Sequence, residues 1–276
     1  MEVVFGGISS LLYGAADFLG GEGARRAPAA AIVFWAGVVS FPLILVVAFL
    51  VGGEATGADY LLGAVAGASG AFGLVFLFAG LGRGRAASVA PIAAAVAAVV
   101  PVVVAVIEGE RPSALAWLGV AVAVPAIVLC AWVADPGAAD RGGVGYGLVA
   151  GLGFGGFTAL IRFTGAESNL LPLVTSRSST MLVVLGLSGL GVWELTRFGE
   201  TPRPIVVGNA ILDVSGNVAL LLAVRAGSLA LAAVAASFYP AVTVMMARVV
   251  NSEHLLRRQV LGLALTLLAM TAIALG

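Results

Sequence analysis

The stretch that decides the fold runs from residue 27 to residue 53 and reads APAAAIVFWAGVVSFPLILVVAFLVGG. It contains 27 residues and no charge. An α-helix needs roughly 20 predominantly apolar residues to cross the hydrocarbon of a bilayer, which is about 30 Å thick. This stretch therefore predicts a membrane-spanning helix.

The same pattern recurs along the whole chain. Of the 276 residues, 61% are hydrophobic and only 10% are charged, which excludes an ordinary soluble domain. Transmembrane β-strands would alternate polar and apolar residues over roughly 10 positions, so helices are the remaining solution. Uncharged runs, with one internal charge allowed, predict an all-α polytopic membrane protein with ten transmembrane helices at 3–22, 27–53, 60–82, 86–107, 112–134, 142–161, 168–193, 204–224, 226–247 and 259–276.

Little of the chain lies outside these spans. The longest hydrophilic connections cover roughly 134–143 and 194–204, which leaves no room for a soluble domain. The first span lacks a basic leader, so we expect a retained helix and not a signal peptide. The formal net charge is zero and there is no basic tail, so no nucleic-acid partner is predicted. The expected surroundings are the lipid bilayer, with the chain as a monomer or a homodimer.

The basic residues also indicate a source. All fourteen are arginine, and alanine, glycine and valine abound, as is typical of a GC-rich bacterial genome. We therefore expect a multi-pass protein of the bacterial plasma (inner) membrane.

Three weak internal matches share nearly one offset. RAASVA at 85–90 matches RAGSLA at 225–230, offset by 140, and YGAADFL at 13–19 matches FGGFTAL at 154–160, offset by 141. EGERPSALAWLG at 108–119 matches NSEHLLRRQVLG at 251–262, offset by 143. Together they predict two five-helix repeats, 1–137 and 138–276. Because five is odd, the second repeat enters the membrane from the opposite side, and such inverted repeats favour alternating access to a midplane site.

The repeats also carry a family pattern. A basic residue, small residues and a serine precede the fourth helix of each half, at 85–88 and 225–228. A Gly-Glu-Arg loop follows at 109–111, and Trp117, Leu118 and Gly119 come after it; the second half has Ser252, Glu253 and His254 in place of that loop. The chain resembles the EamA family of the drug/metabolite transporter superfamily. The resemblance implies a secondary transporter of small metabolites, often an exporter, with a central cavity between the halves.

Polar residues inside one span are the first candidates for a binding site. Asn209, Asp213 and Asn217 are spaced by four, so they share one helix face over about 12 Å. A carboxylate at mid-bilayer costs about 2.5 to 3.5 kcal/mol, so this face should avoid lipid. Two interpretations stand: the residues line a water-filled cavity, or they form a hydrogen-bonded seam that joins helices.

Two further internal charges favour the cavity. Arg177 lies about 14 Å into its span among serines and threonines, and it needs a partner. Asp17 shares a face with Tyr13; it is nearer a span end, where pairing with Arg25 or Arg26 is the alternative. Our hypothesis is that Arg177 forms an ion pair with Asp213 or Asp17 and that substrate binding changes this pairing. Either carboxyl could also carry a proton, which would make protons the coupling ion.

The remaining candidates are weaker. Tyr239, with Ser237 and Thr243, could line the cavity. Trp35 and Phe157 are weaker aromatic candidates, and packing is the favoured interpretation for both. Pro91, Pro101, Pro125 and Pro240 lie within spans, and a glycine at every fourth position from 143 to 155 favours close helix packing. GLGFGG at 151–156 sits inside a span, without the preceding strand that a dinucleotide site requires. His254 has no histidine or cysteine companion, so no metal and no cofactor is predicted.

These observations predict a transporter and not an enzyme. The substrate class expected is a small polar or zwitterionic, amino-acid-like metabolite, and proton-coupled efflux of cationic drugs is the alternative. A membrane enzyme would show paired surface carboxylates or a histidine cluster, and a channel would show a ring of like charges. Orientation stays open: nine arginines follow odd-numbered spans and three follow even-numbered ones, which places both termini outside, whereas the family resemblance implies both inside.

Overall fold

The computed structural model describes residues 1–83, 85–109, 111–130, 142–226, 235–236, 238–253 and 255–276. Within these residues the chain is helical and contains no strand. Two short 3-10 helices, η1 (Ala166–Ser168) and η2 (Phe198–Glu200), lie in connections. The long helices are α1 (Glu2–Ala24), α2 (Ala29–Val51), α3 (Gly57–Leu81), α4 (Ala86–Ile107), α5 (Ala114–Cys130), α6 (Gly142–Ile161), α7 (Leu171–Gly189), α8 (Arg203–Ala226), α10 (Tyr239–Asn251) and α11 (Arg257–Leu275).

Most of these helices can cross a membrane. In the described residues, eight are long and apolar enough to do so, and α5 is a shorter apolar helix. The predicted all-α polytopic fold is confirmed. The predicted ninth span, 226–247, has the wrong end, because α10 continues past Arg248 to Asn251. An uncharged run stops at the first charge, whereas a helix tolerates an arginine in its last turn, where the helix dipole favours it. Residues 227–234 of that span lie outside the described part.

The prolines divide into two kinds. Pro91 and Pro101 lie inside α4 and Pro125 lies inside α5, as predicted. Pro240 lies in the first turn of α10, so its prediction as an interior residue is wrong. Proline fits the first turn because the N–H that it lacks would have no partner within the helix there.

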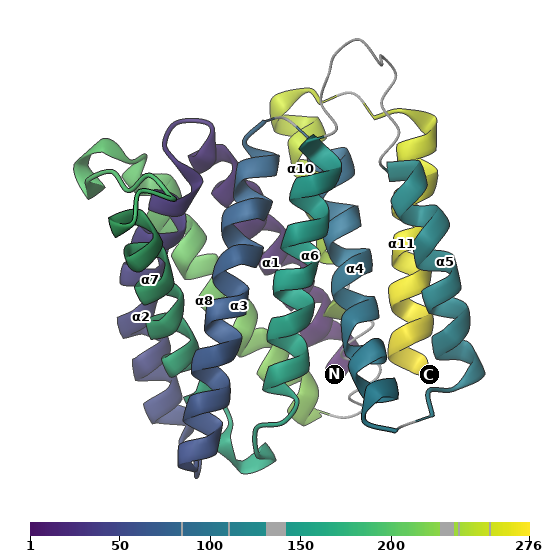
Figure 1. Ribbon diagram of the computed structural model, residues 1–276, viewed down its shortest axis with the longest axis horizontal. Coiled ribbons are helices and arrows are strands. Elements are labelled where there is room, and N and C mark those ends of the chain that lie inside the picture. Colours follow the sequence, from purple (N-terminus) through teal and green to yellow (C-terminus); the bar gives the residue numbers. More distant parts are fainter. Residues whose placement is uncertain (84, 110, 131–141, 227–234, 237, 254) are drawn as a thin grey trace.

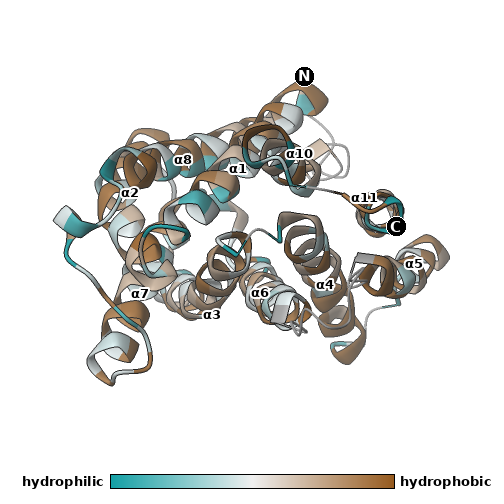
Figure 2. Cartoon of the chain, turned by 90° about the horizontal axis from the view of Figure 1, so that it is seen from above, coloured by the Kyte–Doolittle hydropathy of each residue, from teal (hydrophilic) through white to brown (hydrophobic). Residues whose placement is uncertain are grey.

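Helices of the first half of the chain pack against helices of the second half. The chain rises along α1 and descends along α6, so the first helices of the two halves run in opposite directions, and both termini lie toward the same end (Figure 1). α1 packs against α8 and α10, while its counterpart α6 packs against α3 and α4. α5 and α11 pair with each other at one edge, beside α4 (Figure 2). This exchange of equivalent contacts is the arrangement expected of inverted repeats. The predicted boundary between 137 and 138 lies outside the described residues.

Glycine brings α6 close to two neighbours. A Cβ on Gly151 would lie 2.5 Å from the Cβ of Val96 on α4, and one on Gly147 would lie 2.8 Å from the Cβ of Ile92. On another side of α6, a Cβ on Gly153 would lie 2.4 Å from the backbone nitrogen of Gly73 on α3. The prediction that the α6 glycines serve close packing is confirmed, and this packing positions the site-facing side of α6.

Candidate functional site

A cavity of about 270 Å³ lies between the two halves. Its walls come from α1 and α3 of the first half, α6, α7 and α8 of the second half, and the start of α10. The lining residues are Tyr13, Asp17, Gly70, Leu74, Phe154, Phe157, Thr158, Leu173, Ser176, Arg177, Thr180, Asp213, Asn217 and Tyr239. Six of the seven residues that the sequence singled out thus surround one space.

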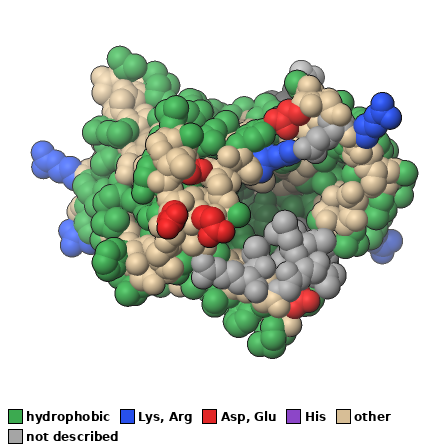
Figure 3. Space-filling view, turned by 90° about the horizontal axis from the view of Figure 1, so that it is seen from below, with side chains coloured by type: hydrophobic (Ala, Val, Ile, Leu, Met, Phe, Trp, Pro, Cys, Tyr) green, Lys and Arg blue, Asp and Glu red, His purple; other side chains and the backbone are tan. Residues whose placement is uncertain are grey.

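The cavity extends from the middle of the bundle, where Asp17 and Leu74 lie past the midpoints of α1 and α3, toward one end. Its α6 residues lie in the second half of that helix and its α7 residues lie in the first half of that one. The α6–α7 connection is at the end where both termini lie (Figure 1). Seen from that end, the molecule is hollowed near its centre (Figure 3). The cavity therefore reaches toward this face, which we call the open end.

An ion pair crosses the cavity wall. The guanidinium of Arg177 on α7 donates to the carboxylate of Asp213 on α8. Their side chains are only 19% and 20% exposed, so both charges are largely removed from solvent. The predicted pairing of Arg177 with Asp213 is confirmed.

The two asparagines on this face of α8 lie in different surroundings. Asn217 lines the cavity, and its amide donates to the backbone oxygen of Asp213 at 2.8 Å. Asn209 is buried and donates to the backbone oxygen of Ala16 at 2.7 Å, which ties α8 to α1. It borders a separate hollow of about 20 Å³ behind the ion pair and does not line the large cavity. Asn217 thus fits the cavity interpretation of this helix face, and Asn209 fits the interpretation as a hydrogen-bonded seam.

Asp17 lines the cavity, and among the described residues it takes no part in an ion pair at the end of α1. Arg25, its proposed alternative partner, pairs instead with Glu22 at 2.9 Å and with Glu253 at 3.2 Å. Among the described residues, nothing donates a hydrogen bond to the Asp17 carboxylate or pairs with it.

Aromatic side chains make up much of the remaining wall. Tyr13 and Tyr239 lie in it as predicted, and Phe154 and Phe157 join them from α6. Phe157, the weaker candidate for which packing was the favoured interpretation, lines the cavity as well. Trp35 does serve packing: its ring contacts Phe34 and Phe198.

Three other candidates lie elsewhere. Thr243 is buried away from the large cavity, where its hydroxyl donates to the backbone oxygen of Gly14 at 3.1 Å. Ser237 and His254 lie outside the described residues.

Two further lining residues, Phe154 and Thr158, could have been found from the predicted internal repeat. At the offset of 141, Tyr13 corresponds to Phe154, and Asp17 corresponds to Thr158. All four line the cavity, two from α1 and two from α6. The offset of 141 was visible in the sequence, so each candidate in one predicted repeat indicates an equivalent position in the other. By contrast, no motif pointed to Ser176 or Thr180 as lining residues.

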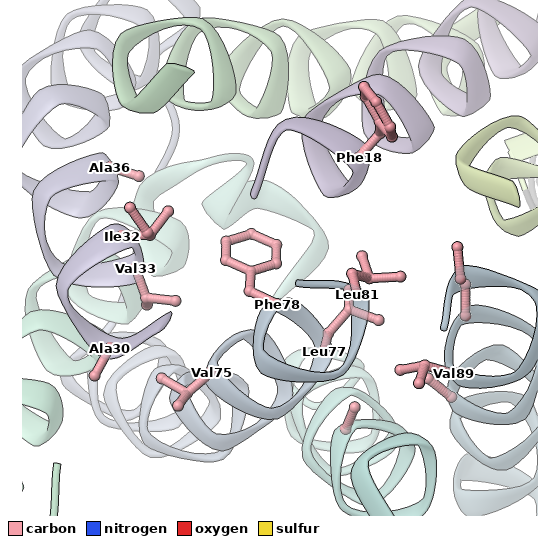
Figure 4. Packing of buried hydrophobic residues seen from close by; sticks show 14 of the residues in the cluster. Phe18, Ala30, Ile32, Val33, Ala36, Val75, Leu77, Phe78, Leu81 and Val89 are labelled. Carbon is pink, nitrogen blue, oxygen red and sulfur yellow. The ribbon is translucent and has the colours of Figure 1, made fainter. Parts of the chain in front are cut away.

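The end opposite the open end is closed by two layers. The inner layer is apolar: Phe18 of α1 and Phe78 and Leu81 of α3 are all buried (Figure 4). Gly20 permits this packing, because a Cβ there would lie 2.2 Å from the Phe78 ring. These buried side chains pack between α1 and α3 on that side of the cavity.

The outer layer is polar and joins α1, α4 and α10. Asn251 donates to Glu22 at 2.5 Å, and the backbone N–H of Ala86 donates to Glu253 at 3.2 Å. Arg25 bridges the two glutamates, whose side chains are 14% and 12% exposed. Burial raises the pKa of Glu253 above its ordinary value, although the Ala86 N–H and Arg25 oppose the shift. We call Glu22, Arg25, Asn251 and Glu253 the closed-end network.

The family-pattern residues lie apart from the cavity. Arg85 immediately precedes α4, and Gly109 has a φ of +87° in the α4–α5 connection, a conformation that favours glycine. Gly119 of α5 faces α11, where a Cβ would lie 2.7 Å from the backbone oxygen of Ala269. These residues shape turns and helix contacts. Glu110 lies outside the described residues.

The fold and the cavity define a class of protein: a polytopic membrane protein whose two halves pack against each other. A cavity lined by polar and aromatic side chains lies between the halves. Residues 1–132 match the model of the EamA-like transporter family, which belongs to the drug/metabolite transporter superfamily. The family resemblance drawn from the sequence is confirmed over these residues, which make up just under half of the chain. A comparison with curated proteins found no match.

Proposed function

We propose that the protein is a secondary transporter that moves a small polar or zwitterionic, amino-acid-like metabolite across the bacterial plasma membrane by alternating access. One observation carries the proposal: a cavity between the two halves extends toward one end of the bundle, whereas buried apolar side chains and a buried polar network lie toward the other end. A channel would need a continuous path, whereas a carrier needs a site that faces one side at a time.

The two ends support this proposal because equivalent contacts differ between them. At the closed end, Asn251 of α10 bonds to Glu22 of α1 within the buried network. At the open end, α4 and α6 are the equivalent pair, and there Glu108 contacts Arg162 at 3.3 Å with both side chains about one-third exposed. In the alternate state we expect the α4–α6 contact to become buried and the closed-end network to separate.

Cationic efflux remains the second candidate. The observation that favours it is Asp17, an acid in the cavity wall without a partner among the described residues. A zwitterion would use Asp17 for its ammonium group and would draw Arg177 from Asp213 for its carboxylate. An organic cation would need Asp17 alone.

Counterflow tests the carrier. A thermal-shift screen of amino acids and amines on the purified protein selects solutes, and radiolabelled hits are then exchanged across proteoliposomes preloaded with the same unlabelled solute. A carrier gives saturable, transient accumulation above equilibrium, whereas linear uptake without accumulation would contradict the proposal. Repeating the exchange with and without a pH gradient tests protons as the coupling ion.

Labelling tests the alternation in the same vesicles. In a Cys130→Ala background, Thr158→Cys should react with an impermeant maleimide from the open-end side only, because Thr158 is exposed in the cavity wall. Thr243→Cys is the matched probe near the closed end, where Thr243 is fully buried. It should react only when counterflow is running. Equal reactivity of Thr243→Cys with and without substrate would contradict alternating access.

A further inference from the structure

The closed-end network contains more acid than base among the described residues. Its two carboxyls, Glu22 and Glu253, share the guanidinium of Arg25, which lies 2.9 Å from an oxygen of the first and 3.2 Å from an oxygen of the second. The two glutamate side chains are only 14% and 12% exposed. With both carboxyls ionised, this largely buried network would hold one negative charge without a partner, which is costly away from water. A single proton removes that charge.

Both carboxyls border one small space. A hollow of about 10 Å³ lies between the closed-end network and the apolar layer, and Glu22, Asn251 and Glu253 line it from the network side. One oxygen of Glu22 accepts from both Arg25 and Asn251, whereas its other oxygen accepts from no described residue. The pair of glutamates therefore has an oxygen left for a proton, in a place that solvent hardly reaches.

The charges that act on Glu253 come from α1. Burial raises the pKa of Glu253, and the nearby carboxylate of Glu22 also raises it, whereas the Ala86 N–H and Arg25 oppose the shift. Arg85, which precedes α4, extends toward the start of α6 instead. His254 lies outside the described residues. The other charged side chains at the ends of α1, α3 and α10 and at the start of α11 are exposed: Arg26, Arg83, Arg248, Arg257 and Arg258.

We propose that Glu22 and Glu253 form a proton-binding gate: they hold one proton between them while the closed end is shut, and they release it to water when that end opens. This assignment rests on the alternating access proposed above and supplies its regulation. Opening would separate α1 from the α10–α11 connection and expose both carboxyls, which removes the burial that favours the protonated form. Low pH therefore favours the closed arrangement of this end, and rising pH favours its opening.

The equivalent contact at the open end is balanced. There one acid, Glu108, meets one base, Arg162, at 3.3 Å, and both side chains are about one-third exposed. This hydrated pair has no excess carboxyl, so it has no comparable need for a proton. Protonation should therefore act on the closed-end network and not on the Glu108–Arg162 contact.

Cysteine reactivity tests the gate in the purified full chain in detergent, where both ends are accessible. In a Cys130→Ala background, Thr243→Cys reports on the closed end, because Thr243 is fully buried and lines the same hollow as the two glutamates. Thr158→Cys reports on the cavity from the open end. The ratio of their maleimide reaction rates divides out the pH dependence that both thiols share. We expect this ratio to rise by roughly fivefold or more between about pH 5 and about pH 8.

Three variants show whether the two glutamates cause this rise. Glu253→Gln and Glu22→Gln each remove the excess carboxyl, so the ratio should stay near its low-pH value in both. Glu194→Gln removes an exposed carboxyl in the α7–α8 connection, outside the network, and should keep the rise of the wild type.

A ratio that stays constant or falls with rising pH in the wild type would overturn the assignment, and so would a wild-type rise in both glutamine variants of the network. Counterflow keeps the gate distinct from the transport proposal. A pH-dependent ratio without counterflow would refute transport and leave the gate standing. Counterflow together with a pH-independent ratio would refute the gate and leave transport standing.

Discussion

The cavity ion pair offers the sharpest test of how the charges are held. Arg177→Gln leaves Asp213 and Asp17 together in one wall with no described cation, whereas Asp213→Asn leaves Arg177 beside a second acid with which it can pair. Breaking a buried pair costs about 3 to 5 kcal/mol, and the roughly one-fifth exposure of each side chain reduces this. We expect about 2 to 3 kcal/mol for Arg177→Gln and about 1 kcal/mol for Asp213→Asn.

The double variant provides the control. Arg177→Gln with Asp213→Asn removes both charges and leaves two amides that can hydrogen-bond, so its cost should fall below that of Arg177→Gln alone. Thermal unfolding in detergent measures this, with about 2 to 4 °C per kcal/mol for a chain of this size class. The expected losses are roughly 8 °C for Arg177→Gln and roughly 3 °C for Asp213→Asn. An equal or larger loss for Asp213→Asn would refute the view that Asp17 is available to Arg177.

Two further predictions concern the closed end. Gly20→Ala should lower the melting temperature by several degrees, because its Cβ would lie 2.2 Å from the Phe78 ring and overpacking costs about 1 to 3 kcal/mol; Gly7→Ala, with no atom within 4 Å of its Cβ, is the matched control and should be neutral or stabilising. The raised pKa of Glu253 means that the folded state holds a proton more tightly than the unfolded state does. Stability should therefore be greatest below the ordinary glutamate pKa of 4.5 and fall as pH rises through the raised value. Melting curves between about pH 4 and pH 7 should show this fall in the wild type and a smaller one in Glu253→Gln, and parallel curves would contradict it.

The fold could be predicted because hydrophobic run length alone specifies membrane helices. Nine of the ten predicted spans overlap a described helix over most of their length. The ninth, 226–247, failed at its end because Arg248 interrupts the run without interrupting α10. A count of charges finds where lipid-compatible sequence stops, and a helix can extend beyond that point into the interface.

Site residues whose side chains cost free energy in a membrane could be predicted from the sequence. Site residues without such a cost could not. Asp17, Arg177 and Asp213 are expensive in a membrane, so their presence alone indicated a polar cavity. Phe157 and Thr180 cost nothing in a transmembrane helix, and only the packing of α6 and α7 turns them toward the cavity. Asn209 was a candidate lining residue because it shares a helix face with Asp213. Its amide instead donates to the backbone oxygen of Ala16 and joins α8 to α1.

The predicted repeats pair cavity positions that carry different side chains, and exchanging these side chains tests the pairing. Asp17 and Thr158 correspond at an offset of 141 and line one cavity, yet only the first can attract a cation. Transferring the carboxyl with Asp17→Thr and Thr158→Asp keeps the charge of the lining and moves it to the second repeat. Position 158 is exposed and therefore better hydrated, which weakens attraction to a cation.

Binding of phenethylamine, an organic ammonium probe for the second candidate function, should consequently fall at least tenfold in Asp17→Thr and recover by about threefold in the double variant. Calorimetry on the two variants and the wild type, at one ionic strength, measures both steps. No recovery would show that the two repeats do not present their equivalent positions to the same bound ammonium group. Full recovery would show that only the net charge of the cavity matters, and not the burial of Asp17 beside its aromatic neighbours.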